Sequence, residues 1–112
     1  MTLVRLDTNR ITDDESFHSV FADVFGFPEF YGRNLNAWID CLTSLDDPEA
    51  GMTAVHAPPG GVLVLELEHV TEFAGRCPRQ YQYIVECAAF VNWRKIAIGD
   101  SAVLALSFHK SA

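Results

Sequence analysis

Apolar and polar positions along the 112-residue chain predict short strands separated by helices. The alternation and β-branched content predict strands at residues 2–6, 62–67 and 102–108. Residues 62–65 are continuously apolar, as in the middle of a buried parallel sheet. The segment 94–101 fits either a strand or the last turn of a helix, and its pattern does not decide between them.

Two of the predicted helices lie on either side of the chain's midpoint. Thr12 and Glu15 form a capping box before the first, which spans about residues 17–25. Pro78 opens the other, which runs to about Trp93. Its expected inward residues are Tyr81, Ile84, Val85, Ala88 and Val91, and a second apolar side holds Tyr83, Cys87 and Phe90. A helix that is apolar on two sides is buried on both or contacts another chain.

A third helix follows an aromatic turn in residues 27–43. Gly26 ends the preceding helix, Gly32 is expected to supply positive φ, and Asn34 can cap a helix that begins at Leu35. The inward stripe is Leu35, Trp38, Ile39, Leu42 and Leu45, with Cys41 at its edge. The opposite face carries Asn36, Asp40 and Thr43, which form a short polar ridge in water.

This order of elements predicts an α/β fold: a small three-stranded parallel sheet packed by three to four helices. A chain of this length, 49% apolar by composition, can bury one core without disulfides, so residues 1–112 are expected to form a single domain. The connection 46–60 is long and rich in Asp, Pro, Gly and Ala. We predict a loop there.

The chain carries a net charge of −7, and the excess is unevenly placed. Residues 1–60 hold ten acidic and three basic side chains, a net of −7, whereas residues 61–112 hold five of each sign. Such a cluster accelerates encounter with a basic partner and disfavours binding to nucleic acid. Alternatively, the negative charge serves only to keep the protein soluble.

The run from Pro28 to Thr43, PEFYGRNLNAWIDCLT, resembles the signature of barstar-like proteins. These are intracellular protein inhibitors of secreted guanyl-specific ribonucleases. The resemblance implies a barstar-like fold and a contact surface on the turn and the outer helix face. The matching contact positions are Phe30, Tyr31, Gly32, Asn34, Leu35, Asn36, Ile39, Asp40 and Thr43.

Asp40 matches the family's central aspartate, which the resemblance places in the nuclease active site where an RNA phosphate would lie. Phe30 keeps the ring of the family's usual tyrosine without its hydroxyl. Asn36 replaces a second aspartate that the family commonly carries, and Ile39 stands where the best-known member has tryptophan. Trp38 is shifted by one place, so the helical spacing turns it inward to the core.

A carboxylate on a rigid helix can accept the charge-assisted hydrogen bonds that a ribonuclease gives to phosphate. The hypothesis requires Asp40 to face solvent without a lasting bond to a neighbouring guanidinium. Asp46 and Asp47 follow the helix at its negative end, where like charge is unfavourable, as expected of residues kept for a partner. They could equally begin a solvated loop.

Other functional classes fit the sequence less well. The four histidines and three cysteines show no metal-ligand spacing, so no metal or other cofactor is expected. Asp40 beside Cys41 could suggest an activated thiol, but Cys41 leans toward the core. The cysteines are interpreted as buried reduced thiols, with Cys77 the most exposed. Glu66 and Glu68 are expected to pair with arginines.

The N-terminus lacks a signal peptide, and no segment has the length of a membrane span, so we expect a cytoplasmic protein. The chain is expected to be a monomer rather than a homodimer, in a 1:1 complex with a basic ribonuclease, and not an enzyme. Three alternatives stay open: a barstar-like module for a partner that is not a ribonuclease, a small-molecule enzyme, and a domain retained for assembly through its long helix.

Overall fold

Three strands and four α-helices make up the computed structural model, which describes residues 2–109. In chain order these are β1 (Thr2–Asp7), α1 (Asp14–Phe25), α2 (Leu35–Thr43), β2 (Leu63–Glu68), α3 (Val70–Arg76), α4 (Pro78–Ala97) and β3 (Leu104–His109). Short 3-10 helices lie at Thr8–Arg10 and Pro48–Ala50. The predicted fold class, a small parallel sheet packed by helices, is confirmed.

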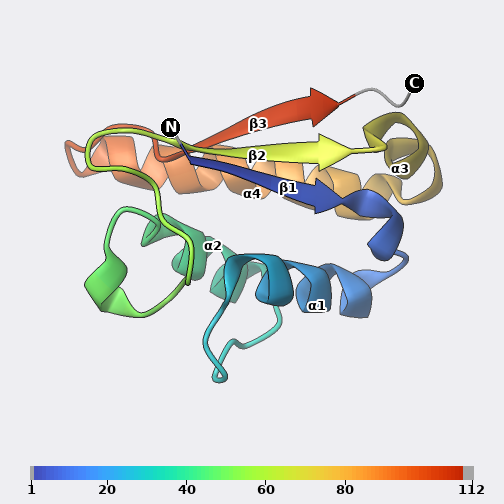
Figure 1. Cartoon of the computed structure of the whole chain (residues 1–112), viewed down its shortest axis with the longest axis horizontal. Helices are drawn as coiled ribbons and strands as arrows, with labels where there is room; N and C mark the ends of the chain where they lie inside the picture. Colours follow the sequence, from blue (N-terminus) through green and yellow to red (C-terminus); the bar gives the residue numbers. More distant parts are fainter. Residues whose placement is uncertain (1, 110–112) are drawn as a thin grey trace.

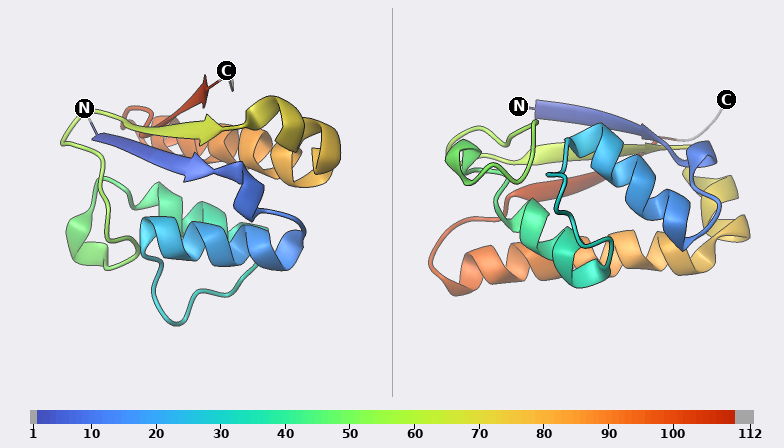
Figure 2. Two further views of the ribbon diagram at one scale, coloured as in Figure 1. Left: turned by 45° about the vertical axis from the view of Figure 1, so that its right-hand side comes forward. Right: turned by 90° about the horizontal axis from the view of Figure 1, so that it is seen from below.

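The sheet has the order β1-β2-β3 and is parallel throughout. Helices α1, α2 and α4 lie on one side of it, and α3 lies beyond the carboxyl end of β2 (Figures 1 and 2). Leu63, Leu65 and Leu67 of the central strand are buried on the helix side. On the other face the Arg5 side chain bonds Glu66 at 2.8 Å, as predicted for that glutamate.

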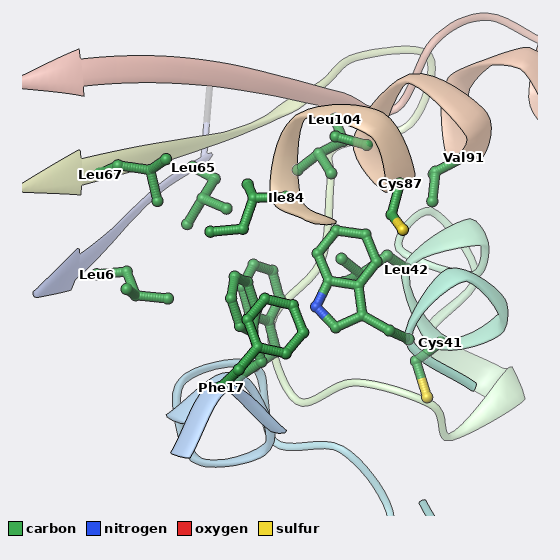
Figure 3. Close-up of a cluster of buried hydrophobic side chains, with 14 of the residues drawn as sticks. Leu6, Phe17, Cys41, Leu42, Leu65, Leu67, Ile84, Cys87, Val91 and Leu104 are labelled. Atoms are coloured by element: carbon green, nitrogen blue, oxygen red, sulfur yellow. The ribbon is translucent and has the colours of Figure 1, made fainter. Parts of the chain in front are cut away.

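The core lies between the sheet and the helices. In Figure 3, Leu6, Leu65 and Leu67 point from the strands toward Phe17 of α1 and Ile84 of α4. Its largest fully buried side chains are Trp38, Phe17, Phe21, Phe25, Phe73, Leu6, Ile11, Leu42, Leu45, Leu63, Leu65 and Leu67. Trp38 therefore lies inward, as the helical spacing predicted, and α2 is held rigidly by its inner face.

Helix α1 begins with a different cap from the one predicted. Asp13 is the N-cap: its carboxylate accepts a bond from the Ser16 backbone at 2.8 Å, and Ser16 Oγ accepts one from the Asp13 backbone. The predicted capping box of Thr12 and Glu15 is wrong by one residue. Asp13 and Ser16 satisfy the backbone N–H groups of the first turn in the way that Ser or Thr and Glu do in the usual capping box. The helix ends at Gly26 (φ 68°), as expected.

Helix α4 extends one turn beyond the predicted end, so residues 96 and 97 belong to the helix rather than to a strand. Of the residues predicted to face inward, Val85 is exposed, so that prediction was wrong. On the second apolar side of the helix, Phe90 is exposed and Cys87 is buried. Phe90 and Trp93 contact each other on the surface, with ring centroids 5.5 Å apart.

The short helix α3 had no counterpart in the sequence prediction. Cys77, between α3 and α4, is buried, which corrects the expectation that it is the most exposed cysteine. The guanidinium of Arg76 explains this burial, because it bonds the carbonyl oxygens of Ile11 and Thr8 and so draws the α3–α4 junction onto the segment after β1.

Candidate protein-binding site

The aromatic turn before α2 is fixed to α1 by the side chain of Arg33. The Arg33 guanidinium donates to the Glu15 carbonyl oxygen at 3.0 Å and to Ser19 Oγ at 2.9 Å. Arg33, not Gly32 as predicted, adopts the positive φ of the turn, at 53°. Asn34 then caps α2 as expected, accepting the Ala37 N–H at 2.8 Å.

Tyr31 lies beneath this turn instead of on its surface. Its hydroxyl bonds the buried His18 Nδ1 at 2.6 Å, and the side chain belongs to the core. Burial raises the pKa of the Tyr31 hydroxyl. Burial and the Arg33 charge lower the pKa of His18, and Asp14 opposes them in part. The expected contact residue Tyr31 therefore supports the turn from below.

Phe30 and Asp40 lie at a small hollow between the turn and the middle of α2. The hollow encloses about 170 Å³ and is lined by Phe30, Tyr31, Gly32, Ala37, Asp40, Cys41 and Met52. Phe30 is 76% exposed, so it is available to a partner. Met52 comes from the 46–60 connection, which brings that loop to the site. No local pattern in the sequence singles out Met52.

The polar ridge of α2 forms largely as predicted. Asn36 and Asp40 are exposed and Thr43 is half-buried, with its hydroxyl donating to the Ile39 carbonyl oxygen at 2.6 Å. Ile39 was expected among the contact residues, but its side chain is buried in the core. It offers a partner little area in this structure.

Asp40 is exposed, yet it has an intramolecular partner. Its side chain is 58% exposed, and its Oδ1 accepts a 2.7 Å hydrogen bond from the Arg94 guanidinium of α4. The hypothesis required that Asp40 have no lasting bond to a guanidinium; Asp40 does bond one in this structure, although both side chains of the pair stay exposed. Because both groups remain in contact with water, the pair is worth about 0–1 kcal/mol and can exchange. A partner with several cations can outcompete it.

Asp46 and Asp47 differ in their surroundings. The largely buried Lys95 ammonium lies 2.9 Å from the Asp46 carboxylate and 3.4 Å from Asp100. Burial alone would lower the pKa of Lys95, but the bonds and charges of the two aspartates outweigh it and raise the pKa. Asp46 thus joins the segment after α2 to α4, whereas Asp47, which is also exposed, lies beyond this ion pair.

A larger hollow lies on the other side of Asn34 and Leu35. It encloses about 390 Å³ and is lined by Asp14, Glu15, His18, Arg33, Asn34, Leu35 and Tyr83. Asp14 is already engaged there, since it accepts a 2.7 Å bond from Gln80 and lies 3.4 Å from the Tyr83 hydroxyl. We assign the site to the smaller hollow, because that hollow includes both Phe30 and Asp40.

The thiol beneath Asp40 is not activated. Burial, and to a smaller extent the Asp40 charge, raises the pKa of Cys41 to about 11, so the thiol stays protonated near neutral pH. Within residues 2–109, no group of three or more His, Cys, Asp or Glu side chains is arranged to hold a metal ion. No helix formed by these residues is long and apolar enough to cross a membrane.

Comparison with known proteins gives a family for the chain. A search of curated proteins found no match. Among models of protein families, the one described as Barstar (barnase inhibitor) matches residues 1–101, which is most of the chain. The parallel sheet and the helix order agree with the fold that the signature implied. The chain therefore belongs to the barstar (barnase inhibitor) family.

Proposed function

We propose that the chain is a cytoplasmic, stoichiometric inhibitor of a guanyl-specific ribonuclease, of the antitoxin or immunity type. The observation that carries the proposal is the exposed Asp40 carboxylate beside Phe30 at one hollow, in a member of an inhibitor family. Asp40 takes the place of an RNA phosphate in the nuclease. Around it Phe30, Asn34, Leu35, Asn36 and Thr43 supply shape and hydrogen bonds.

The chemistry of this inhibition follows from what a ribonuclease must do. Its cleft stabilises the negative charge of a phosphodiester, so it presents Arg, Lys and His side chains. A carboxylate accepts the same charge-assisted hydrogen bonds and offers no bond to cleave. The buried Trp38 and Leu42 hold α2 against the core, so Asp40 is presented with little loss of backbone entropy on binding.

Long-range charge supports the same assignment. The first 60 residues, which contain the turn and α2, carry the whole net charge of −7. Such a field speeds encounter with a basic nuclease and weakens as salt is added. Asp47, exposed next to α2, contributes to that field. We propose a 1:1 complex with a monomeric inhibitor.

The experiment that tests the proposal is titration of a ribonuclease with Asp40→Ala beside a matched control. The nucleases are barnase and any ribonuclease recovered by pull-down from the source organism. Asp23→Ala is the control: Asp23 lies on α1, is 67% exposed, and pairs with Arg10 at 2.9 Å. Both substitutions remove one negative charge and one exposed ion pair between a helix aspartate and an arginine.

Asp40→Ala should lose about 2–5 kcal/mol of binding free energy, a general range that rests partly on the barnase–barstar pair itself. This corresponds to a rise in Kd of about 30- to 4,000-fold. Asp23→Ala should change Kd only through steering, and both variants should keep the parent's stability. Equal inhibition by the parent and Asp40→Ala would show that Asp40 is not the phosphate surrogate.

A second function is a barstar-like module that binds a protein other than a ribonuclease. Two observations favour it: Asn36 supplies no second carboxylate, and Arg94 neutralises the one at Asp40. In that case a pull-down would recover a tight protein partner without ribonuclease activity. The parent would then leave barnase fully active.

A further inference from the structure

Arg94 of α4 lies against the centre of the proposed site. Its Nη1 donates to Asp40 Oδ1 at 2.7 Å, and its guanidinium lies 5.3 Å from the centre of the Phe90 ring. The Arg94 side chain is 39% exposed. Asp40 of α2 and Phe90 of α4 therefore hold this cation over the outer face of α2. Arg94 and Asp40 are 54 positions apart in the sequence.

The position of Arg94 conflicts with the charge of the surface that it joins. The proposed inhibitor presents a carboxylate to a cationic cleft, and Arg94 places a cation directly beside that carboxylate. To bind, the nuclease must break the bond between Asp40 and Arg94. The displaced Arg94 guanidinium then lies next to the positively charged cleft and is repelled by it. Each of these effects lowers affinity for a nuclease.

We infer that Arg94 is a specificity-determining residue: it competes with the nuclease for Asp40 and so selects partners whose cations displace it. This inference rests on the proposed function. Its chemical consequence is a preference for clefts that present several cations, above all arginines, because a guanidinium can bond both carboxylate oxygens whereas the Arg94 bond engages Oδ1.

The size of the effect follows from the exposure of the pair. A solvent-exposed ion pair shifts the equilibrium between bonded and unbonded Asp40 by a factor of up to about five. When only the unbonded form is competent, the apparent Kd rises by a factor of one plus the ratio of bonded to unbonded Asp40. Removing Arg94 should therefore lower Kd about two- to six-fold, with a further gain from lost repulsion.

The test compares Arg94→Gln with a control that makes the same charge change elsewhere. Arg5→Gln is matched: Arg5 is 68% exposed and pairs with Glu66 at 2.8 Å on the sheet face opposite the helices. Both variants gain one unit of negative charge, so general steering is equal in the two. Kd is measured by titrating a ribonuclease that the parent inhibits, at two salt concentrations.

Arg94→Gln should bind at least two-fold more tightly than Arg5→Gln, by about the factor expected for release of Asp40. In an Asp40→Asn background the gain should shrink, since no carboxylate remains to be released. Equal or weaker binding by Arg94→Gln would overturn the inference while leaving the inhibitor assignment intact. A parent that inhibits no ribonuclease would overturn the proposed function, and the inference with it.

Discussion

Asn92→Ala is expected to loosen the attachment of β3 to α4. The Asn92 side chain donates to the Leu104 carbonyl oxygen at 2.8 Å and accepts the Val103 and Leu104 N–H groups at 3.0 and 3.1 Å. Both partner residues are buried, so water cannot readily replace the lost amide. The same helix carries Arg94 two residues later, which links this anchor to the geometry of the binding site.

The magnitude can be worked from these three bonds. A hydrogen bond contributes about 1 kcal/mol net, and a buried group left without a partner costs about 1–3 kcal/mol. Loss of all three should lower the free energy of unfolding by about 3 kcal/mol. Since small domains are stable by about 5–15 kcal/mol, the variant should fold but be visibly weakened.

Urea unfolding followed by circular dichroism measures this loss. With a slope of about 1–3 kcal/mol per molar urea, the midpoint should fall by about 1–3 M. Asn36→Ala is the control, because Asn36 is an exposed helix asparagine; it should change stability by less than about 0.5 kcal/mol. A loss below about 1 kcal/mol for Asn92→Ala would refute the reasoning, since it would mean that the three bonds are readily replaced.

Two further predictions concern α1. Because the folded pKa of His18 lies below its ordinary 6.5, the unfolded chain binds the proton first, so stability should decline as the pH falls below about 6.5. Urea unfolding between pH 7.5 and 5.5 should show a smaller decline in His18→Gln than in the parent; equal declines in the two proteins would contradict this. Gly26→Ala should lose more than about 2 kcal/mol, measured by urea unfolding, because φ is +68° and the new Cβ would lie 2.4 Å from Ala54 Cβ. A variant as stable as the parent would show that the turn relaxes freely.

Sequence periodicity was sufficient for most of the fold because local and tertiary preferences agree in this chain. The apolar run near residue 63 is the buried central strand, and the stripe of α2 meets the core as its spacing predicted. Asn34 begins α2 because its side chain caps the helix, and Gly26 ends α1 because its backbone adopts positive φ. At these positions one residue's chemistry decides the local structure.

Prediction failed where the decisive contact comes from elsewhere in the chain. Helix α3 is only seven residues long and begins after His69 in a left-handed conformation, with no capping side chain to mark it. Cys77 is buried by Arg76 bonding carbonyl oxygens more than 60 positions away. Such long-range contacts leave no periodic signal in the sequence.

The candidate site shows the same division. Its turn, its helix and the exposure of Asp40 followed from the motif, whereas the bond to Arg94 depends on how α2 packs on α4. The burial of Tyr31 depends on His18, 13 residues earlier. Asp46 likewise meets Lys95 only in the folded chain. The sequence thus predicted the local structure of the candidate site better than the intramolecular bonds that its residues make.

The parallel pairing of β1 with β2 has a consequence for when the binding surface can exist. Thr2 lies opposite Leu63, so the whole segment that carries the turn and α2 is a loop closed by that one strand pair. Closing about 60 residues costs entropy that is recovered only when the core assembles, which makes such topologies slow to fold. A nascent chain therefore presents no complete surface until β2, and α4 on which α2 packs, have been synthesised and docked.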